Sequence, residues 1–238
     1  MTEFAIIAAS LATCITAIII LFTLFEMKTQ RNLSFKPTLV PIRQSIYTSK
    51  QEEYFCWREV REIAEENAQF FTTDYPLHIY NLGNGAAKNI RTKWILDIQN
   101  IIDTINSICQ KNMSQVYFEL DEKNWMKINN KGSSKANINT TLDMEGEYDH
   151  LMPASIDKEG INVRMPLTFL ILSSYYFFEG GKSKDGTTTL GNKPEIKLQI
   201  SYEDIAGTKY VINYRFSLSL IMYSESFFHA ILENKTET

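Results

Sequence analysis

Cysteine and histidine are scarce in this chain of 238 residues, and their spacing excludes the common zinc and disulfide frameworks. There is no CxxC pair and no HExxH segment, and no histidine lies near a cysteine. One cysteine falls in a long apolar segment, which leaves two for a soluble domain and is typical of a reducing compartment. The residues concerned are Cys14, Cys56, Cys109, His78, His150 and His229.

Motifs for nucleotide binding and nucleophilic catalysis are also missing. The segment 180–183 (GGKS) is the nearest approach to a phosphate-binding loop, but that motif needs glycine at position 176, where the chain has Tyr176. No GxSxG segment and no cysteine–histidine signature occurs. We therefore expect no catalytic, cofactor-binding or metal-binding residue and no enzyme, with a hydrolase built from carboxylates distant in sequence as the alternative.

Four carboxylates lie close together in the polar stretch 121–150. Asp143, Glu145, Glu147 and Asp149 could supply oxygen ligands to Ca²⁺, but their spacing does not match an EF-hand. The prediction is a solvated acidic loop over 143–149, with metal binding as the open alternative.

Charge is absent from residues 4–25, which form 22 consecutive uncharged residues. A helix of that length rises about 33 Å, enough for a hydrocarbon core of about 30 Å. The segment lacks the positive start of a signal peptide, continues past the weak lipobox around Cys14, and is unusually long for a buried helix. We predict a membrane anchor over residues 1–27.

Basic residues follow the apolar segment, with no acidic residue between Glu26 and Glu52. Lys28, Arg31 and Lys36 are expected to contact the membrane surface and to keep this side in the cytoplasm. The prediction is a single-pass protein of the bacterial inner (plasma) membrane, N-terminus out. Residues 28–50 form a basic neck, whose segment 36–47 is expected to be an extended linker or a first edge strand, and residues 51–238 form a cytosolic domain.

The remainder of the chain is acidic, because 19 basic and 26 acidic residues follow residue 50. A nucleic-acid-binding domain needs a basic face that displaces counterions from phosphates. We therefore expect no nucleic-acid partner.

Hydrophobic periodicity predicts the elements of this domain. Helices are expected near 52–71, after a capping box that starts at Ser49, and near 97–111. Strands are expected at 76–81, 88–96 and 116–120, followed by a long loop or loose hairpin over 121–150. An antiparallel hairpin is expected from 196–203 and 212–222. Segment 166–178 fits a buried strand or a helix, and we favour the helix.

The segment 81–89 (NLGNGAAKN) joins two predicted strands. Its Asn-Gly pair is a hairpin signal, its glycines permit left-handed backbone, and its outer asparagines can cap the turn. We interpret it as a structural turn. The residues concerned are Asn81, Gly83, Asn84, Gly85 and Asn89.

The same segment resembles the N-x-G-x-G-x-A-x-N signature of bacterial immunoglobulin-like β-sandwich domains. Segments 151–154, 161–166 and 200–210 are similar to a functionally unassigned family of bacterial proteins with one N-terminal membrane helix and a cytosolic sandwich. The resemblance implies an N-terminal transmembrane helix followed by an α+β domain, an antiparallel immunoglobulin-like β-sandwich with helical insertions. It implies no activity.

Small residues recur every four positions in the apolar segment, at Ala5, Ala9, Thr13 and Ala17. Such a row lets helices pack closely in a bilayer, so homo-oligomerisation through this helix is one expectation, and scattered small residues on a lipid-facing helix are the alternative. Two functions follow. The chain is a non-enzymatic binding module that holds a cytosolic protein partner at the membrane, or a regulated membrane effector, for example in phage defence, whose helix self-associates when the domain senses a ligand.

Overall fold

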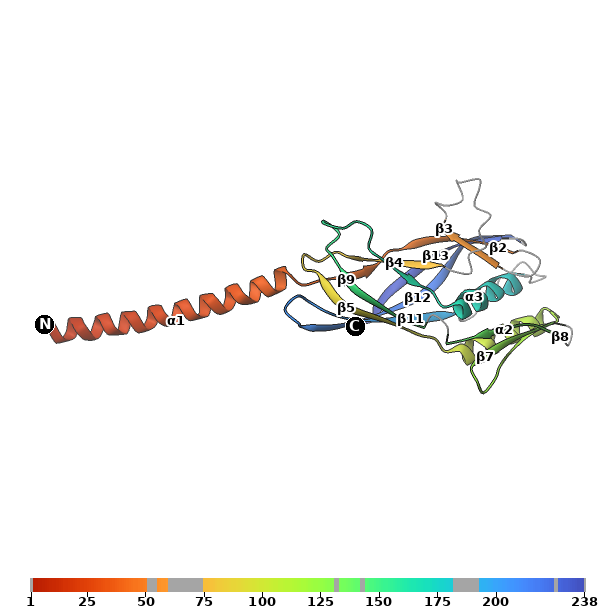
Figure 1. Ribbon diagram of the computed structural model, residues 1–238, viewed down its shortest axis with the longest axis horizontal. Coiled ribbons are helices and arrows are strands. Elements are labelled where there is room, and N and C mark those ends of the chain that lie inside the picture. The colour runs from red at the N-terminus through yellow and green to blue at the C-terminus, as the bar shows by residue number, and fades with distance from the viewer. Residues whose placement is uncertain are drawn as a thin grey trace.

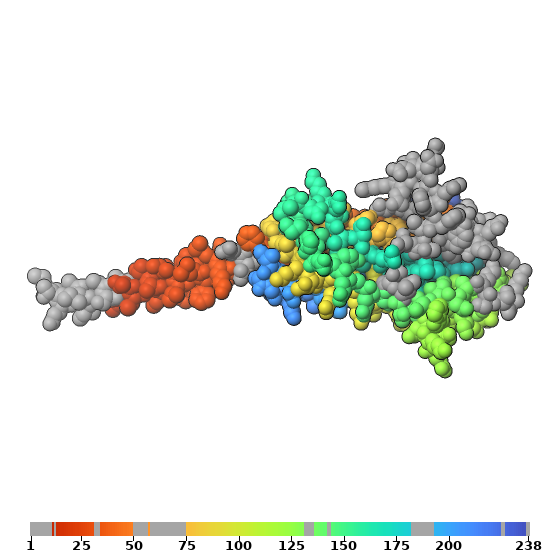
Figure 2. All heavy atoms as spheres, viewed as in Figure 1, coloured from red at the N-terminus to blue at the C-terminus, as the bar shows by residue number. Residues whose placement is uncertain are grey.

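A long N-terminal helix stands clear of a mostly antiparallel β domain in the computed structural model (Figure 1). The structure describes residues 2–50, 55–59, 75–130, 133–141, 144–181, 193–224 and 227–237. Helix α1 (Thr2–Ser34) is long and apolar enough over Thr13–Gln30 to cross a membrane, and none of that window is buried. Figure 2 shows its described part projecting from the domain as a single rod.

Helix α1 runs beyond the predicted anchor because residues 26–31 (EMKTQR) are mostly good helix formers. Gln30 donates a hydrogen bond to Glu26 one turn earlier, at 3.3 Å. The helix ends at Ser34, three residues before Pro37, whose ring disfavours helical backbone in the preceding residue.

The predicted neck over 28–50 is wrong as a linker, because most of it belongs to the helix or the domain, and the alternative of a first edge strand is confirmed. Residues 28–34 continue α1, while β1 (Leu39–Pro41) and β2 (Gln44–Lys50) are strands. Strand β1 pairs with β4 (Pro76–Asn81), and β2 pairs with β3 (Phe55–Glu59) and β13 (Phe227–Glu237). Only residues 35–38 therefore separate α1 from the first strand.

The main layer is a seven-stranded antiparallel sheet in the order β3-β2-β13-β12-β11-β5-β9. It contains the predicted hairpin as β11 (Glu195–Glu203) and β12 (Lys209–Tyr223), with Leu198 opposite Tyr214. It also contains β5 (Ala87–Ile95) and β9 (Glu145–Leu151). Strand β13 was not predicted, although Phe228, Ala230 and Leu232 alternate on its buried face.

A second, three-stranded sheet has the order β1-β4-β10, where β10 covers Ile161–Arg164. The strands predicted at 76–81 and 88–96 are confirmed as β4 and β5, but the hairpin between them is wrong. They belong to different sheets, because β4 pairs with β1 and β10 while β5 pairs with β9 and β11. The segment 82–86 is therefore a crossing between two sheets.

The helices predicted at 97–111 and 166–178 are confirmed. Helix α2 (Ile98–Lys111) is capped by Asp97, whose side chain accepts from the Asn100 backbone N–H at 3.3 Å. Helix α3 (Leu167–Gly180) has ten of its 14 residues buried. A helix buried on all sides shows no helical period, which explains why its sequence also fitted a strand.

The helix predicted at 52–71 is wrong where the structure describes it, because Phe55–Glu59 form β3. Ser49, the expected cap, lies in β2 opposite Cys56. Sheet pairing and burial of Trp57 outweigh the helical pattern, since its indole N–H donates to Ser174 on α3 at 2.8 Å. The rest of the predicted helix, residues 60–71, lies outside the described residues.

Of the two alternatives predicted over 121–150, the long loop is wrong and the hairpin is found in part, because this stretch contains three strands of which two pair as a hairpin. After β6 (Val116–Leu120), which was predicted, β7 (Trp125–Asn130) and β8 (Ser133–Asn139) complete a third antiparallel sheet beside α2. Residues 145–151 form β9 at the edge of the main sheet.

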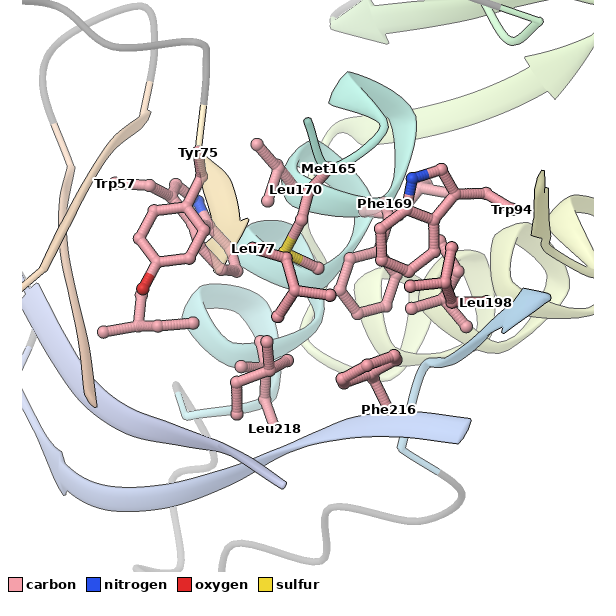
Figure 3. Close-up of a cluster of buried hydrophobic side chains, with 14 of the residues drawn as sticks. Trp57, Tyr75, Leu77, Trp94, Met165, Phe169, Leu170, Leu198, Phe216 and Leu218 are labelled. Atoms are coloured by element: carbon pink, nitrogen blue, oxygen red, sulfur yellow. The ribbon is translucent and has the colours of Figure 1, made fainter. Parts of the chain in front are cut away.

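One hydrophobic core joins the described layers. Figure 3 shows side chains from β4, α3 and the main sheet meeting at its centre. Burying one large apolar side chain stabilises the fold by about 1.5–3 kcal/mol. The central residues are Trp57, Tyr75, Leu77, Trp94, Met165, Phe169, Leu170, Leu198, Phe216 and Leu218.

Candidate functional site at the junction of helix and domain

The short segment 35–38, which joins α1 to the domain, lies against the crossing segment 82–86. Asn81 at the end of β4 is 1% exposed, and its amide makes four hydrogen bonds. Its Oδ1 accepts from the backbone N–H groups of Thr38 and Gly83, each at 3.0 Å. Its Nδ2 donates to the carbonyls of Gly85 at 2.7 Å and Leu151 at 3.2 Å. One buried amide thus ties the junction to the crossing segment and to β9.

The two glycines of the crossing segment leave space for the backbone of residues 35–38, which lies against them. A Cβ at Gly83 would overlap the Lys36 carbonyl oxygen and lie 2.6 Å from the Thr38 nitrogen, and one at Gly85 would overlap the Phe35 carbonyl oxygen. The expected left-handed backbone is wrong here, since neither glycine has a positive φ. These positions are glycine because another backbone lies against them.

Side chains of the main sheet and of β13 bind the other side of this segment. Tyr202 donates to the Pro37 carbonyl at 3.2 Å, Tyr214 to the Leu39 carbonyl at 2.6 Å, and Asn234 to the Pro41 carbonyl at 2.9 Å. Alternate carbonyls of an extended chain point the same way, so the three donors bind one edge of residues 37–41.

The two tyrosines are protonated at neutral pH, and burial extends the protonated range to higher pH. It raises the pKa of Tyr202 to about 12, with a smaller contribution from Tyr210 and Tyr214. Burial also raises the pKa of Tyr214. Both hydroxyls therefore donate hydrogen bonds throughout the physiological range.

Lys36 extends this contact to the β11–β12 turn. Its Nζ lies 5.1 Å from the centroid of the Tyr210 ring, which stacks on Tyr202 at 5.2 Å. The Tyr210 hydroxyl donates to Asp204 at 3.0 Å. Although burial opposes the shift, hydrogen bonds from Thr208 and Tyr210 lower the pKa of Asp204.

Asn89 does not cap the crossing segment as predicted. It adopts a left-handed backbone with φ 52° beside the irregularity in the β5–β11 pairing, and its Nδ2 donates to Glu203 at 3.1 Å. Asn84 lies exposed in the crossing segment. Of the five residues predicted as a structural turn, Asn81, Gly83 and Gly85 hold the junction.

The residues predicted to contact the membrane surface lie in different environments in the structure. Lys28 is exposed on α1, whereas Lys36 lies over Tyr210. In the small-residue row, Thr13 and Ala17 are exposed on α1. The side chains of Arg31, Ala5 and Ala9 lie outside the described residues.

The acidic segment is strand rather than loop, and two of its carboxylates pair with cations of β5. Glu145 lies 3.1 Å from Lys93, and Glu147 lies 3.2 Å from Arg91. Among the described residues no group of three or more histidine, cysteine or acidic side chains could hold a metal ion. Asp143 lies outside them, as do residues 182–183 of the GGKS segment.

A hollow of ≈ 560 Å³ lies on the outer face of the main sheet, next to the junction. Its lining includes the Arg91–Glu147 ion pair and Glu203, which binds Asn89 and lies 4.0 Å from Lys209. Four of its five charged side chains are thus paired within the described part of the protein, the exception being Asp149.

Sequence reasoning missed the tyrosine and Asn234 contacts to residues 37–41. The sequence predicted Tyr202 and Tyr214 as buried strand residues. It could not predict their hydrogen-bond partners, because these lie more than 160 residues away in the sequence. No family model, curated protein or solved structure matches this chain.

Proposed function

We propose that this protein is a membrane-anchored binding module, with α1 in the bacterial inner membrane and the β domain in the cytoplasm. The observation that carries this proposal is α1, whose apolar window Thr13–Gln30 is wholly exposed. Lys28, Arg31 and Lys36 follow that window or lie at its end, which favours a cytoplasmic domain. Labelling tests this orientation. A cysteine at Ser219, on the outer face of β12, should react with a membrane-impermeant maleimide only after cells are permeabilised, and reaction in intact cells contradicts it.

The fold we propose for the domain is an immunoglobulin-like β-sandwich. Its support is two antiparallel sheets that share one core, with Leu77 and Ile79 of the smaller sheet buried together with Leu198 and Phe216 of the larger. Sandwiches of this kind serve many unrelated functions, so the fold alone selects none.

The binding surface we propose for a cytosolic protein is the outer face of the main sheet. It carries cations and anions in cross-strand pairs, such as Lys93 with Glu145 and Arg215 with Glu195 at 3.3 Å. Such mixed charge suits a polar interface that discriminates between partners.

Photocrosslinking in cells tests this surface with the full chain. A photoreactive residue at Gln199 on the outer face should give one discrete protein adduct. The matched control is Ile200, which is fully buried in the same strand and should give none. No adduct at Gln199 or at the neighbouring outer positions Lys197 and Ser201 counts against the binding module.

The clamped junction favours a second candidate, the regulated membrane effector. Only residues 35–38 separate α1 from β1, and contacts of Asn81, Gly83, Gly85 and Tyr202 hold them. A movement of the domain would therefore be transmitted to α1. Ala9→Leu or Ala17→Leu should then abolish membrane depolarisation on overexpression, with Ile18→Leu as the control, and unchanged depolarisation contradicts this candidate.

A further inference from the structure

Three loops of the domain converge on the end of α1, and each exposes one large aliphatic side chain. The crossing segment 82–86 carries Leu82, the segment 152–157 carries Ile156, and the β11–β12 turn carries Ile205. Their exposed fractions are 65%, 69% and 65%. Among the described residues outside α1, these are the three most exposed leucine, isoleucine or valine side chains.

Contacts with the junction place all three loops at this end of the domain. The crossing segment lies against Phe35 and Lys36. Segment 152–157 starts beside Asn81, whose carbonyl accepts from the Ala154 N–H at 2.8 Å. The β11–β12 turn is flanked by Tyr210, over which Lys36 lies. Figure 1 shows the crossing segment and the β11–β12 turn next to the end of α1.

The length of α1 sets the height of these loops above a membrane. The uncharged run ends nine residues before Ser34, and the apolar window ends at Gln30, four residues before it. At about 1.5 Å per residue, Ser34 lies about 6–13 Å from the edge of the hydrocarbon. The headgroup layer is about 5–7 Å thick on each side, so the loops lie at its outer boundary and their apolar side chains can reach into it.

We propose that Leu82, Ile156 and Ile205 form a lipid-contacting rim that rests in the headgroup layer around the end of α1. The proposal rests on the proposed membrane span. It adds that the domain itself contacts lipid and has a fixed orientation on the membrane surface. Exposed apolar side chains at loop tips are stabilised by burial in the interface, as on amphipathic membrane-surface helices.

Charge does not drive this contact. The segments 82–86, 152–160 and 203–209 together carry Lys158 and Lys209 against four acidic residues, Asp157, Glu159, Glu203 and Asp204. The attraction is therefore apolar, and contact should be the same with and without an anionic phospholipid.

Tryptophan quenching in vesicles tests the rim with the full chain. Leu82→Trp, Ile156→Trp and Ile205→Trp are made one at a time, and the emission that each adds to wild type is measured with lipids carrying a nitroxide on the headgroup. We expect a clear loss of the added emission at each position, because the side chain reaches into the headgroup layer.

Ile221→Trp is the matched control. Ile221 is 51% exposed on the same strand as Lys209, twelve residues further on, or about 40 Å along β12. Its added emission should not be quenched. Unchanged melting temperatures of the variants would show that the fold is intact. Equal quenching at Ile221 and at the loops overturns the proposal, as does quenching that appears only with anionic phospholipid.

Ile18→Trp separates this proposal from the membrane span on which it rests. Ile18 is exposed within the apolar window of α1, so a nitroxide on the acyl chain should quench it. Quenching of Ile18→Trp without quenching at the three loops overturns the rim and leaves the span standing. Absence of quenching at all four positions overturns both.

Discussion

Replacing Asn81 by alanine should destabilise the domain more than replacing any polar residue of the adjoining crossing segment 82–86. The substitution removes four hydrogen bonds and leaves the Thr38 and Gly83 N–H groups and the Gly85 and Leu151 carbonyls without this partner. Each such bond contributes about 0.5–1.5 kcal/mol. Because the four are neighbours and water can enter partly, we expect a loss of about 2–4 kcal/mol in the free energy of unfolding.

Denaturant unfolding of the full chain in detergent, followed by tryptophan emission, measures this loss, since Trp57 and Trp94 are each 2% exposed. Asn84→Ala is the matched control, because Asn84 is exposed in the crossing segment and its loss should cost less than about 0.5 kcal/mol. Asn81→Asp would set a buried carboxylate oxygen against the Gly85 and Leu151 carbonyls, so it should be at least as destabilising as Asn81→Ala. An Asn81→Ala protein as stable as the Asn84→Ala protein would refute the reasoning that this amide holds the junction.

Three further perturbations test the same region. Gly85→Ala should cost about 1–3 kcal/mol in unfolding free energy because its Cβ would overlap the Phe35 carbonyl, and a neutral effect would show that the junction can move aside. Folding raises the pKa of Tyr202 to about 12, so its contribution to stability is complete below its unfolded pKa of about 10 and is lost as pH rises through 12. Tyr202→Phe should make unfolding free energy fall less steeply between pH 10 and pH 12, and an unchanged slope argues against the shift. Asn89→Val should destabilise by about 1–2 kcal/mol because a β-branched residue strains at φ 52°, while Asn89→Gly should be nearly neutral, and circular-dichroism melting curves compare the two.

Elements with strong local patterns were predictable from the sequence. The uncharged run indicated α1, and strict alternation indicated the β11–β12 hairpin with its boundaries nearly correct. Helix α2 followed from the helical spacing of its isoleucines. Each of these patterns lies within one segment, so the secondary structure of that segment can be predicted without knowing its distant partners.

The errors arose where a distant segment decides the structure. The apolar residues near Trp57 fit a helical face, yet pairing with β2 and contact with Ser174 make that segment a strand. The Asn-Gly pair has the composition of a hairpin turn, but β4 and β5 join different sheets. Gly83 and Gly85 were likewise predicted to adopt left-handed backbone. Their role instead depends on a segment more than 40 residues earlier, for which they leave space.

The position of β13 in the main sheet means that the sheet can be completed only after β13 itself has been synthesised. Strand β2 reaches the rest of that sheet through β13, and Ile46 pairs with Ala230, more than 180 residues later. Translation at about 5–20 residues per second puts at least several seconds between the two strands. During that time α1 has already left the ribosome and can enter the membrane, while β2 and β3 lack this neighbour. In the membrane topology proposed above, the domain would complete its fold as a tethered chain, with its half-formed sheet edge at the bilayer surface and away from other nascent chains in the cytoplasm.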